Sequence, residues 1–380
     1  MTDLEFSVAA GAGPGLGGPL PPAGFIGRHA ELAAMTAAAA SVMATTAGTP
    51  PTVPVSTAPV IAITGMGGVG KTALAVHWAR SAATDWLYVD LHGFGPAQPT
   101  APADALAELL RGLGVRDVQM PPGLNARATL FRSLSAGRRI LVVLDNARDS
   151  TQLRPLLPGP LTVVTSRNPT TPGAPTVQLG PLHPADALDL LAARIGRDRV
   201  DAEPTAARRL TEACGRLPLA LGILAARAAT RRTIRLTALA NELQDATTLD
   251  AFAILDAFAS DRDGADLRTA LSWSYKALAP DAARLFRRLA LPRPGEITVT
   301  IAAAVAGEPD VRPLLRDLAA ANLISERHPG RYAMHPLLRA YARELDLAAR
   351  DTEDRSAAIR RLHARARGDE LNRAGSPVCS

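Results

Sequence analysis

The chain has 380 residues, a length typical of about two or three domains. Hydrophobic residues make up 47% and charged residues 21% of it, which is typical of a globular protein and excludes a largely disordered chain. The net charge of +6 allows an acidic partner such as nucleic acid, but arginine is spread through many predicted helices.

Two further features limit the class of protein. Cys214 and Cys379 are the only cysteines, so they cannot form a metal site by themselves, and a disulfide framework is not indicated. No run approaches the roughly 18 apolar residues of a membrane span, so we expect no membrane partner and take the cytoplasm as the default location.

The first 59 residues precede the main pattern of strands and helices. Residues 7–24 are rich in Gly, Pro and Ala, which predicts a disordered leader over 1–24. Phe25-Ile26-Gly27-Arg28 then opens an Ala-rich helix predicted to reach about Met43. Residues 44–59 contain prolines 50, 51, 54 and 59, which predicts a linker.

Residues 60–72, Val-Ile-Ala-Ile-Thr-Gly-Met-Gly-Gly-Val-Gly-Lys-Thr, are the most informative segment. They fit G-x-x-x-x-G-K-[ST] between a predicted strand and a predicted helix, and this order wraps backbone N–H groups around a phosphate. Lys71 is then expected to reach the β- and γ-phosphates and Thr72 to hold Mg²⁺. The purely structural alternative is a glycine-rich turn before an ordinary helix. The predicted phosphate-binding residues are Gly65, Gly67, Gly68, Val69, Gly70, Lys71, Thr72 and Ala73.

Strands and helices alternate after this loop. We expect strands at 86–90, 139–145 and 161–166, with helices at 103–113 and 125–134 between the first two. This alternation predicts an α/β fold with a parallel sheet, in a P-loop nucleotide-binding domain covering 25–180.

Polar residues follow two of these strands. Asp145 ends an apolar strand and is predicted to hold the Mg²⁺ shell with Thr72; the alternative is an aspartate that caps the next turn. Asn146 follows it, and an amide cannot act as a base, so ATP hydrolysis should be slow. Arg167 ends the next strand, where it is either a γ-phosphate contact or a surface arginine. Lys71, Asp145 and Arg167 form the expected catalytic set.

The second half of the chain is mainly helical. Helices at 184–195, 204–214 and 218–229 each begin with proline, which suits a first turn that has no N–H partner to lose, and predict a helical domain at 181–260. Four more helices are followed by short β segments at 323–325 and 331–334, which predict a winged-helix domain at 261–346. A charged tail covers 347–380. The four predicted helices span 267–278, 280–291, 298–306 and 311–321.

Four further motifs, in order, resemble those of the NB-ARC class of STAND signalling ATPases, in particular the actinobacterial antibiotic-regulator-type (AfsR/SARP-like) proteins. Residues 25–31 are similar to the hhGRExE motif, and 144–148 to the second kinase motif. Residues 215–220 match GxPLA, and 332–336 resemble the motif that contains Met-His-Asp.

The resemblance implies an ATP/ADP-operated switch with slow Mg²⁺-dependent hydrolysis that regulates transcription or secondary metabolism. It places Phe25, Ile26 and Arg28 near adenine and ribose, Pro218 against adenine and His335 at the ADP β-phosphate. Purely structural alternatives remain for three of them: a helix-start salt bridge for Arg28, a helix-starting proline at Pro218 and a helix N-cap at His335.

The sequence departs from this family in several places. Pro336 replaces the aspartate of Met-His-Asp, so the polar latch on the ADP-bound form should be weakened, and His29 replaces a usual acid. Family members usually carry an activator domain in front and a tetratricopeptide array behind. Too few residues follow Leu345 for about three such repeats of about 34 residues. The expected partners are therefore nucleotide, a second copy of the chain, or a separate sensor or effector protein.

The sequence leaves two other functions open. One is a DNA-binding transcriptional regulator acting through the winged helix, but the helix at the recognition position is mostly apolar and contributes only Arg312 and Arg316. The other is a metabolic kinase. Asn146 and the lack of a substrate-domain insertion argue against it.

Overall fold

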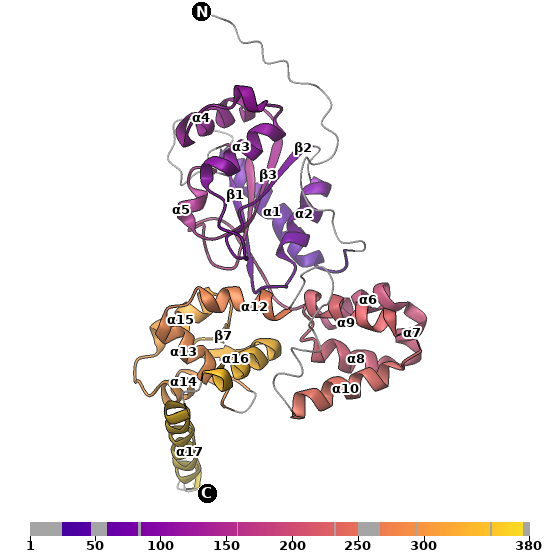
Figure 1. Cartoon of the computed structure of the whole chain (residues 1–380), viewed down its shortest axis with the longest axis vertical. Helices are drawn as coiled ribbons and strands as arrows, with labels where there is room; N and C mark the ends of the chain where they lie inside the picture. The colour runs from indigo at the N-terminus through magenta and orange to yellow at the C-terminus, as the bar shows by residue number, and fades with distance from the viewer. Residues whose placement is uncertain are drawn as a thin grey trace, which may run out of the picture. The chain divides into compact units, whose positions relative to one another are not determined.

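The structure is a computed structural model of the chain (Figure 1). It describes residues 25–46, 59–82, 85–157, 159–231, 233–249, 267–292, 295–349 and 352–374. The predicted leader at 1–24 and most of the predicted linker lie outside these ranges. The described residues divide into two compact units, one formed by 25–65 and 69–182 and the other by 66–68 and 183–374. The finer domain boundaries inside the second unit stay predictions.

A five-stranded sheet forms the centre of the first unit. The strand order is β2-β3-β4-β1-β5 and every neighbouring pair is parallel, which confirms the expected α/β fold. β5 was not expected, because four residues of alternating burial give a weak sequence signal. The strands are β1 (Val60–Gly65), β2 (Asp85–Asp90), β3 (Ile140–Ala147), β4 (Leu161–Ser166) and β5 (Thr176–Leu179).

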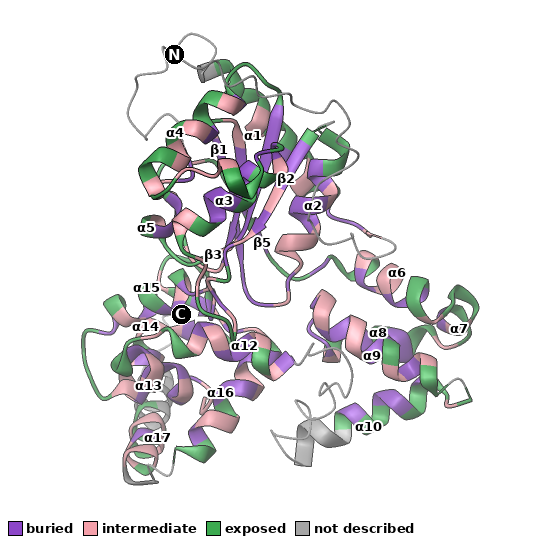
Figure 2. Ribbon diagram, turned by 45° about the horizontal axis from the view of Figure 1, so that its top comes forward, coloured by how far each residue is buried: buried purple, intermediate pink, exposed green. Residues whose placement is uncertain are grey.

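Helices cover both faces of this sheet. α2 contacts β1, β3 and β4, and α1 lies beside α2, whereas α3 packs on β2 and against α4. Figure 2 shows the central strands buried and the outer sides of α3 and α4 exposed. Each aliphatic side chain removed from water here stabilises the fold by roughly 1.5–3 kcal/mol. The helices are α1 (His29–Thr46), α2 (Lys71–Ala82), α3 (Pro102–Gly112), α4 (Leu124–Ser135) and α5 (Ser150–Leu153), with a 3₁₀ turn at Asp117–Gln119.

The second unit begins with five helices. Proline occupies the first turn of α6, α8 and α9, as predicted from the sequence. α10 was not expected; its first turn is held by the Glu203 carboxylate, which accepts hydrogen bonds from the N–H groups of Leu236 and Thr237. The helices are α6 (Pro184–Ile195), α7 (Arg197–Ala202), α8 (Pro204–Ala213), α9 (Pro218–Thr230) and α10 (Leu236–Leu249).

Four more helices and a three-stranded antiparallel sheet of order β6-β8-β7 follow. The expected strand at 323–325 instead starts at Ser325. The reason is that the Leu323 N–H closes the end of α15 by donating to Leu318 O, with Asn322 in the left-handed region. The elements are α12 (Leu267–Lys276), α13 (Pro280–Arg288), α14 (Val299–Ala306), α15 (Arg312–Ala320), β6 (Ile297–Thr298), β7 (Ser325–His328) and β8 (Arg331–Ala333).

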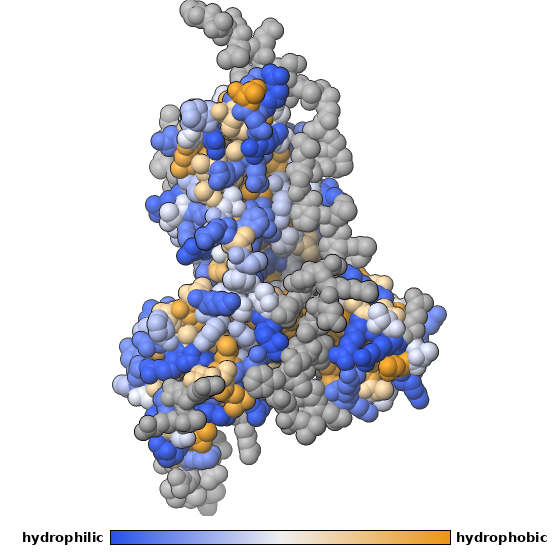
Figure 3. Space-filling view, viewed as in Figure 1, coloured by the Kyte–Doolittle hydropathy of each residue, from blue (hydrophilic) through white to orange (hydrophobic). Residues whose placement is uncertain are grey.

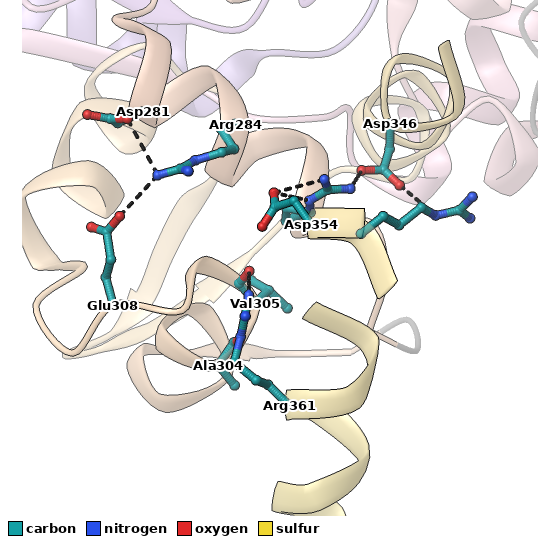
Figure 4. Close-up of polar contacts among 10 residues, drawn as sticks. Asp281, Arg284, Ala304, Val305, Glu308, Asp346, Asp354 and Arg361 are labelled. Atoms are coloured by element: carbon teal, nitrogen blue, oxygen red, sulfur yellow. Dashed lines mark hydrogen bonds and ion pairs between the residues drawn. The ribbon is translucent and has the colours of Figure 1, made fainter. Parts of the chain in front are cut away.

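Two long helices, α16 (Pro336–Ala348) and α17 (Thr352–Ala374), complete the described chain. Arg288 of α13 pairs with Asp346 of α16 and Asp354 of α17 (Figure 4). Arg361 of α17 donates to the carbonyls of Ala304 and Val305 at the end of α14. These bonds fix α17 against α13 and α14 within the second unit.

On the face drawn in Figure 3, apolar side chains lie in small groups separated by polar ones. No helix of the described segments is long and apolar enough to cross a bilayer.

Candidate functional site

The loop between β1 and α2 is shaped by a close approach of two backbones. A Cβ on Gly65 would lie 2.7 Å from the carbonyl oxygen of Leu179 on β5, and Gly65 has a φ of +150°. Glycine is therefore required at this position. The loop turns directly into α2 at Lys71, so its N–H groups and the helix N-terminus meet where an anion would bind.

Lys71 is the central charge of this loop. Its Nζ donates a hydrogen bond of 2.8 Å to the carbonyl oxygen of Gly65. Burial lowers the pKa of Lys71 to about 7, with a further lowering from the charge of Arg167 and an opposing contribution from Asp145. Because burial disfavours the charged form of Lys71, an anion bound beside it would stabilise that form.

Asp145 lies on β3 opposite the first turn of α2. The β3–β4 register shifts between Leu144 and Ala147, and this bulge carries Asp145 at the carboxyl edge of the sheet. The Thr72 hydroxyl lies 2.9 Å from both carboxylate oxygens, and Thr165 also donates to the carboxylate. Asp145 is only 4% exposed, and this burial raises its pKa.

Tyr88 is a site residue that the sequence reasoning missed. Its hydroxyl donates to Asp145 Oδ2 at 3.0 Å from the neighbouring strand β2. Burial, followed by the charges of Asp145 and Asp90, raises the pKa of Tyr88, so the phenol stays protonated as a donor. The sequence pattern that could have identified Tyr88 is the alternation of side chains along β2. It places Tyr88 and Asp90 on one face at the carboxyl end of the strand.

The residues present fit Mg²⁺. The Thr72 hydroxyl and the Asp145 carboxylate supply adjacent hard oxygen atoms, and Mg²⁺ commonly uses one or two protein ligands with water and substrate phosphates. Within the described ranges no group of three or more His, Cys, Asp or Glu side chains could hold a metal by itself.

Arg28 connects the segment before α1 to the loop. It adopts a left-handed φ of 64°, pairs with Glu31 at 2.7 Å, and donates to the carbonyls of Val69 and Gly180. The helix-start salt bridge, which was the purely structural alternative for Arg28, is therefore present, and Arg28 also binds the backbone of the phosphate loop. Phe25 stacks on His77 of α2 with ring centroids 4.1 Å apart, and Ile26 is half-buried beside it in the chain.

Arg167 follows β4 at the same edge of the sheet. Its guanidinium lies over the Phe94 ring, 5.2 Å from the centroid, and burial lowers its pKa to about 10. Gly67 and Val69 are buried, and Gly70 and Ala73 are half-buried. The first unit thus brings together Lys71, Thr72, Asp145 and Arg167.

Pro218 and His335 both lie in the second unit. Pro218 occupies the first turn of α9, and the Leu219 N–H donates to the carbonyl of Gly68. His335 is the N-cap of α16, where Nδ1 accepts from the Leu337 N–H, and its Nε2 donates to the Gly215 carbonyl at 2.8 Å. The N-cap alternative for His335 is thus present together with a bond to the Gly215 segment.

Two curated relatives match a large part of the chain. The regulatory protein AfsR of Streptomyces coelicolor is 41% identical over 318 residues, which cover 80% of this chain and 31% of that protein. The protein of the same name from Streptomyces griseus is 41% identical over 296 residues, covering 75% of this chain and 30% of the relative. The chain therefore spans about a third of the length of these relatives. No protein-family model matches it.

Solved structures give weaker likenesses. The Walker-type ATPase PABY2304 of Pyrococcus abyssi aligns with a TM-score of 0.49 and 12% identity, covering 84% of this chain and 95% of that one. The Aeropyrum pernix Orc1 protein in complex with DNA aligns with a TM-score of 0.38 and 14% identity, covering 86% and 95%. At such scores, the argument for function depends on the residues of this chain.

Proposed function

We propose that this chain is a regulatory switch that binds ATP and ADP through the loop 65–72 and hydrolyses ATP slowly. The observation that carries the proposal is the position of the Lys71 ammonium, which donates to the Gly65 carbonyl at the N-terminus of α2, in the same turn as the Thr72–Asp145 pair. This combination of a flexible cation, helix N–H groups and two hard oxygens matches the needs of a nucleotide phosphate with Mg²⁺.

The roles of the side chains follow from their positions. Lys71 would exchange the Gly65 carbonyl for phosphate oxygens, and Thr72 and Asp145 would hold Mg²⁺. Tyr88 and Thr165 keep the Asp145 carboxylate oriented toward Thr72. Bound Mg²⁺ would neutralise charge on the phosphates. Arg167 would contact the terminal phosphate, and Arg28 would stabilise the loop through the Val69 carbonyl.

The regulatory part of the proposal draws on the relatives and on the second unit. The matched proteins are called regulatory proteins, and the match covers most of this chain. We assign the region 261–346 as a winged helix and 181–260 as a helical domain of the NB-ARC/STAND type, with Phe25, Pro218 and His335 as nucleotide contacts. A second copy of the chain or a separate sensor protein would be the partner.

A DNA-binding function has less support. The exposed positions of α15 combine Arg312 and Arg316 with the acidic Asp317, whereas a groove-reading helix usually presents a basic and amide-rich face. A salt-dependent DNA complex at micromolar protein would favour this alternative.

The purified protein can be denatured and its released nucleotide identified by chromatography, followed by calorimetric titration with ATP and ADP with and without Mg²⁺. We expect bound ADP or ATP, and affinity that depends on Lys71. Lys276→Ala is the matched control, because Lys276 is the only other lysine and is exposed on α12. Absence of any nucleotide binding by the wild-type protein would overturn the proposal.

A further inference from the structure

We propose that the loop after β2, residues 91–94, holds Arg167 in position: the guanidinium packs on the Phe94 ring, and the Asn146 side chain fixes the loop. Arg167 would then contact the terminal phosphate from a fixed position. This inference rests on the proposed nucleotide-binding function and assigns positioning roles to Phe94 and Asn146.

The loop is bonded to the end of β3 along its backbone. The Leu91 N–H donates to the Asp145 carbonyl at 2.9 Å, and the Gly93 N–H donates to the Asn146 carbonyl at 2.8 Å. A Cβ on Gly93 would collide with the backbone nitrogen of Arg148 and the carbonyl of Asn146. Only glycine allows this close approach.

Asn146 completes the attachment with its side chain. Its Nδ2 donates to the Phe94 carbonyl at 3.0 Å, and its N–H donates to the Thr165 hydroxyl at 2.9 Å. Asn146 has a φ of 58°, a left-handed value that asparagine tolerates better than most residues. An ionised aspartate at this position has no donor for the Phe94 carbonyl. The Asn146 amide, which cannot act as a base in hydrolysis, therefore serves to fix the loop through the Phe94 carbonyl.

A second side chain fixes the other end of the loop. Gln152 is buried, and its Nε2 donates to the carbonyls of Leu91 and Thr100 at 2.8 and 2.9 Å. Its Oε1 accepts from the Arg148 N–H, which joins the loop to the segment that follows β3. The loop is consequently fixed at both ends before any ligand arrives.

The Phe94 ring then acts on Arg167. The ring is buried at 9% exposure, and the guanidinium carbon lies 5.2 Å from its centroid, within the about 6 Å range of a cation–π attraction. The charge of Arg167 also lowers the pKa of Lys71, so the guanidinium lies within electrostatic reach of the phosphate-loop lysine. A cation held on a ring at the edge of the sheet where Asp145 meets Thr72 is suited to sense one additional phosphate.

The test compares the affinity for ATPγS with that for ADP, both with Mg²⁺, by calorimetric titration. Phe94→Leu should lower the ATPγS-to-ADP affinity ratio about threefold or more, because it removes the ring and keeps apolar bulk. Phe94→Tyr keeps a ring and should restore the ratio. Arg167→Met should lower the ratio as well, and adding Phe94→Leu to it should cause no further loss.

Phe131→Leu is the matched control, since Phe131 is a buried phenylalanine of the same unit in the core against α3 and should change stability without changing the ratio. If Phe94→Leu does not fold, Asn146→Gly replaces it, because glycine accepts the same φ while removing the amide donor; a lowered ratio is expected. The proposed role of Phe94 would be overturned by an unchanged ATPγS-to-ADP affinity ratio in these variants. It would also be overturned if Phe94→Leu lowered that ratio as much in the Arg167→Met background as in the wild type. Wild-type protein that binds neither nucleotide would instead overturn the proposed function.

Discussion

The ammonium of Lys71 donates to the carbonyl oxygen of Gly65, six residues earlier in the chain, at 2.8 Å. The phosphate loop thus satisfies its own lysine in the structure. Burial nevertheless lowers the pKa of Lys71, so the surroundings of the ammonium disfavour its charged form in the nucleotide-free protein. A phosphate oxygen carries more negative charge than this carbonyl and should displace it.

Removing this ammonium should abolish tight nucleotide binding while the fold survives. We expect Lys71→Ala to weaken ATP and ADP binding more than tenfold, about 1.4 kcal/mol or more, by calorimetric titration. The far-ultraviolet circular dichroism should not change, because alanine favours the helix at the first position of α2. Lys276→Ala should bind like the wild type. Unchanged affinity in Lys71→Ala would contradict the phosphate role.

The pKa of Lys71 also predicts a pH dependence. Folding lowers this pKa from its ordinary 10.5 to about 7, so between these values the unfolded chain binds more protons. The contribution of Lys71 to stability therefore rises with pH across this window in the nucleotide-free protein. Nucleotide favours the charged form, so binding at pH 8 should take up a proton and affinity should fall from pH 7 to pH 9.

Calorimetry in two buffers of different ionisation enthalpy measures this proton uptake. Lys71→Met provides the reference, because it has similar length and no titrating group. Equal proton release or uptake in the wild type and Lys71→Met would show that another group accounts for the dependence.

The sequence predicted the parts of the site that lie on regular elements. The glycine loop and Asp145 follow apolar strands, so their positions at one sheet edge could be deduced from the parallel α/β pattern. Tyr88 and Phe94 could not be identified in this way. Tyr88 contacts Asp145 on the neighbouring strand, and Phe94 contacts Arg167 from a loop. A single sequence does not specify which residues of two strands or loops face each other. The short β5 was missed because four residues leave little periodicity.

ATP hydrolysis should be slow. Asn146 bonds the Phe94 carbonyl through its amide and offers no base to a water molecule. We expect a single-turnover rate on the order of intrinsic small-GTPase rates rather than kinase rates. Rapid-quench measurement with radiolabelled ATP and Mg²⁺ gives the rate directly. A rate above about 1 per second would mean that another residue supplies the base.

The buried pair of Arg288 and Asp346 should control the stability of the second unit. Both side chains are 1% exposed, so removing Arg288 takes the shared guanidinium away from the buried Asp346 and from Asp354, and Asp346 is left with Arg355 at 3.0 Å. We expect Arg288→Met to lower the free energy of unfolding by about 3 kcal/mol in urea, the lower end for a broken buried pair, because Arg355 still compensates part of the charge of Asp346. Arg288→Met with Asp346→Leu should recover much of that loss. Arg284→Met is the control, because its partners Asp281 and Glu308 are exposed and such pairs contribute about 0–1 kcal/mol. Equal losses for Arg288→Met and Arg284→Met would contradict the burial argument.

Pro336 should tune how long ADP stays bound. His335 caps α16 and bonds the Gly215 carbonyl, and Pro336 starts the helix without a polar side chain. Pro336→Asp would add a carboxylate at this helix N-terminus, where negative charge is favoured, and polar contacts of about 1–3 kcal/mol become available to the ADP-bound form. We therefore expect slower ADP dissociation in stopped-flow measurements with a fluorescent ADP. His335→Asn keeps an N-cap acceptor but is too short for Gly215, and it should speed dissociation. Equal off-rates in all three proteins, with nucleotide bound in each, would mean that His335 serves only to start α16.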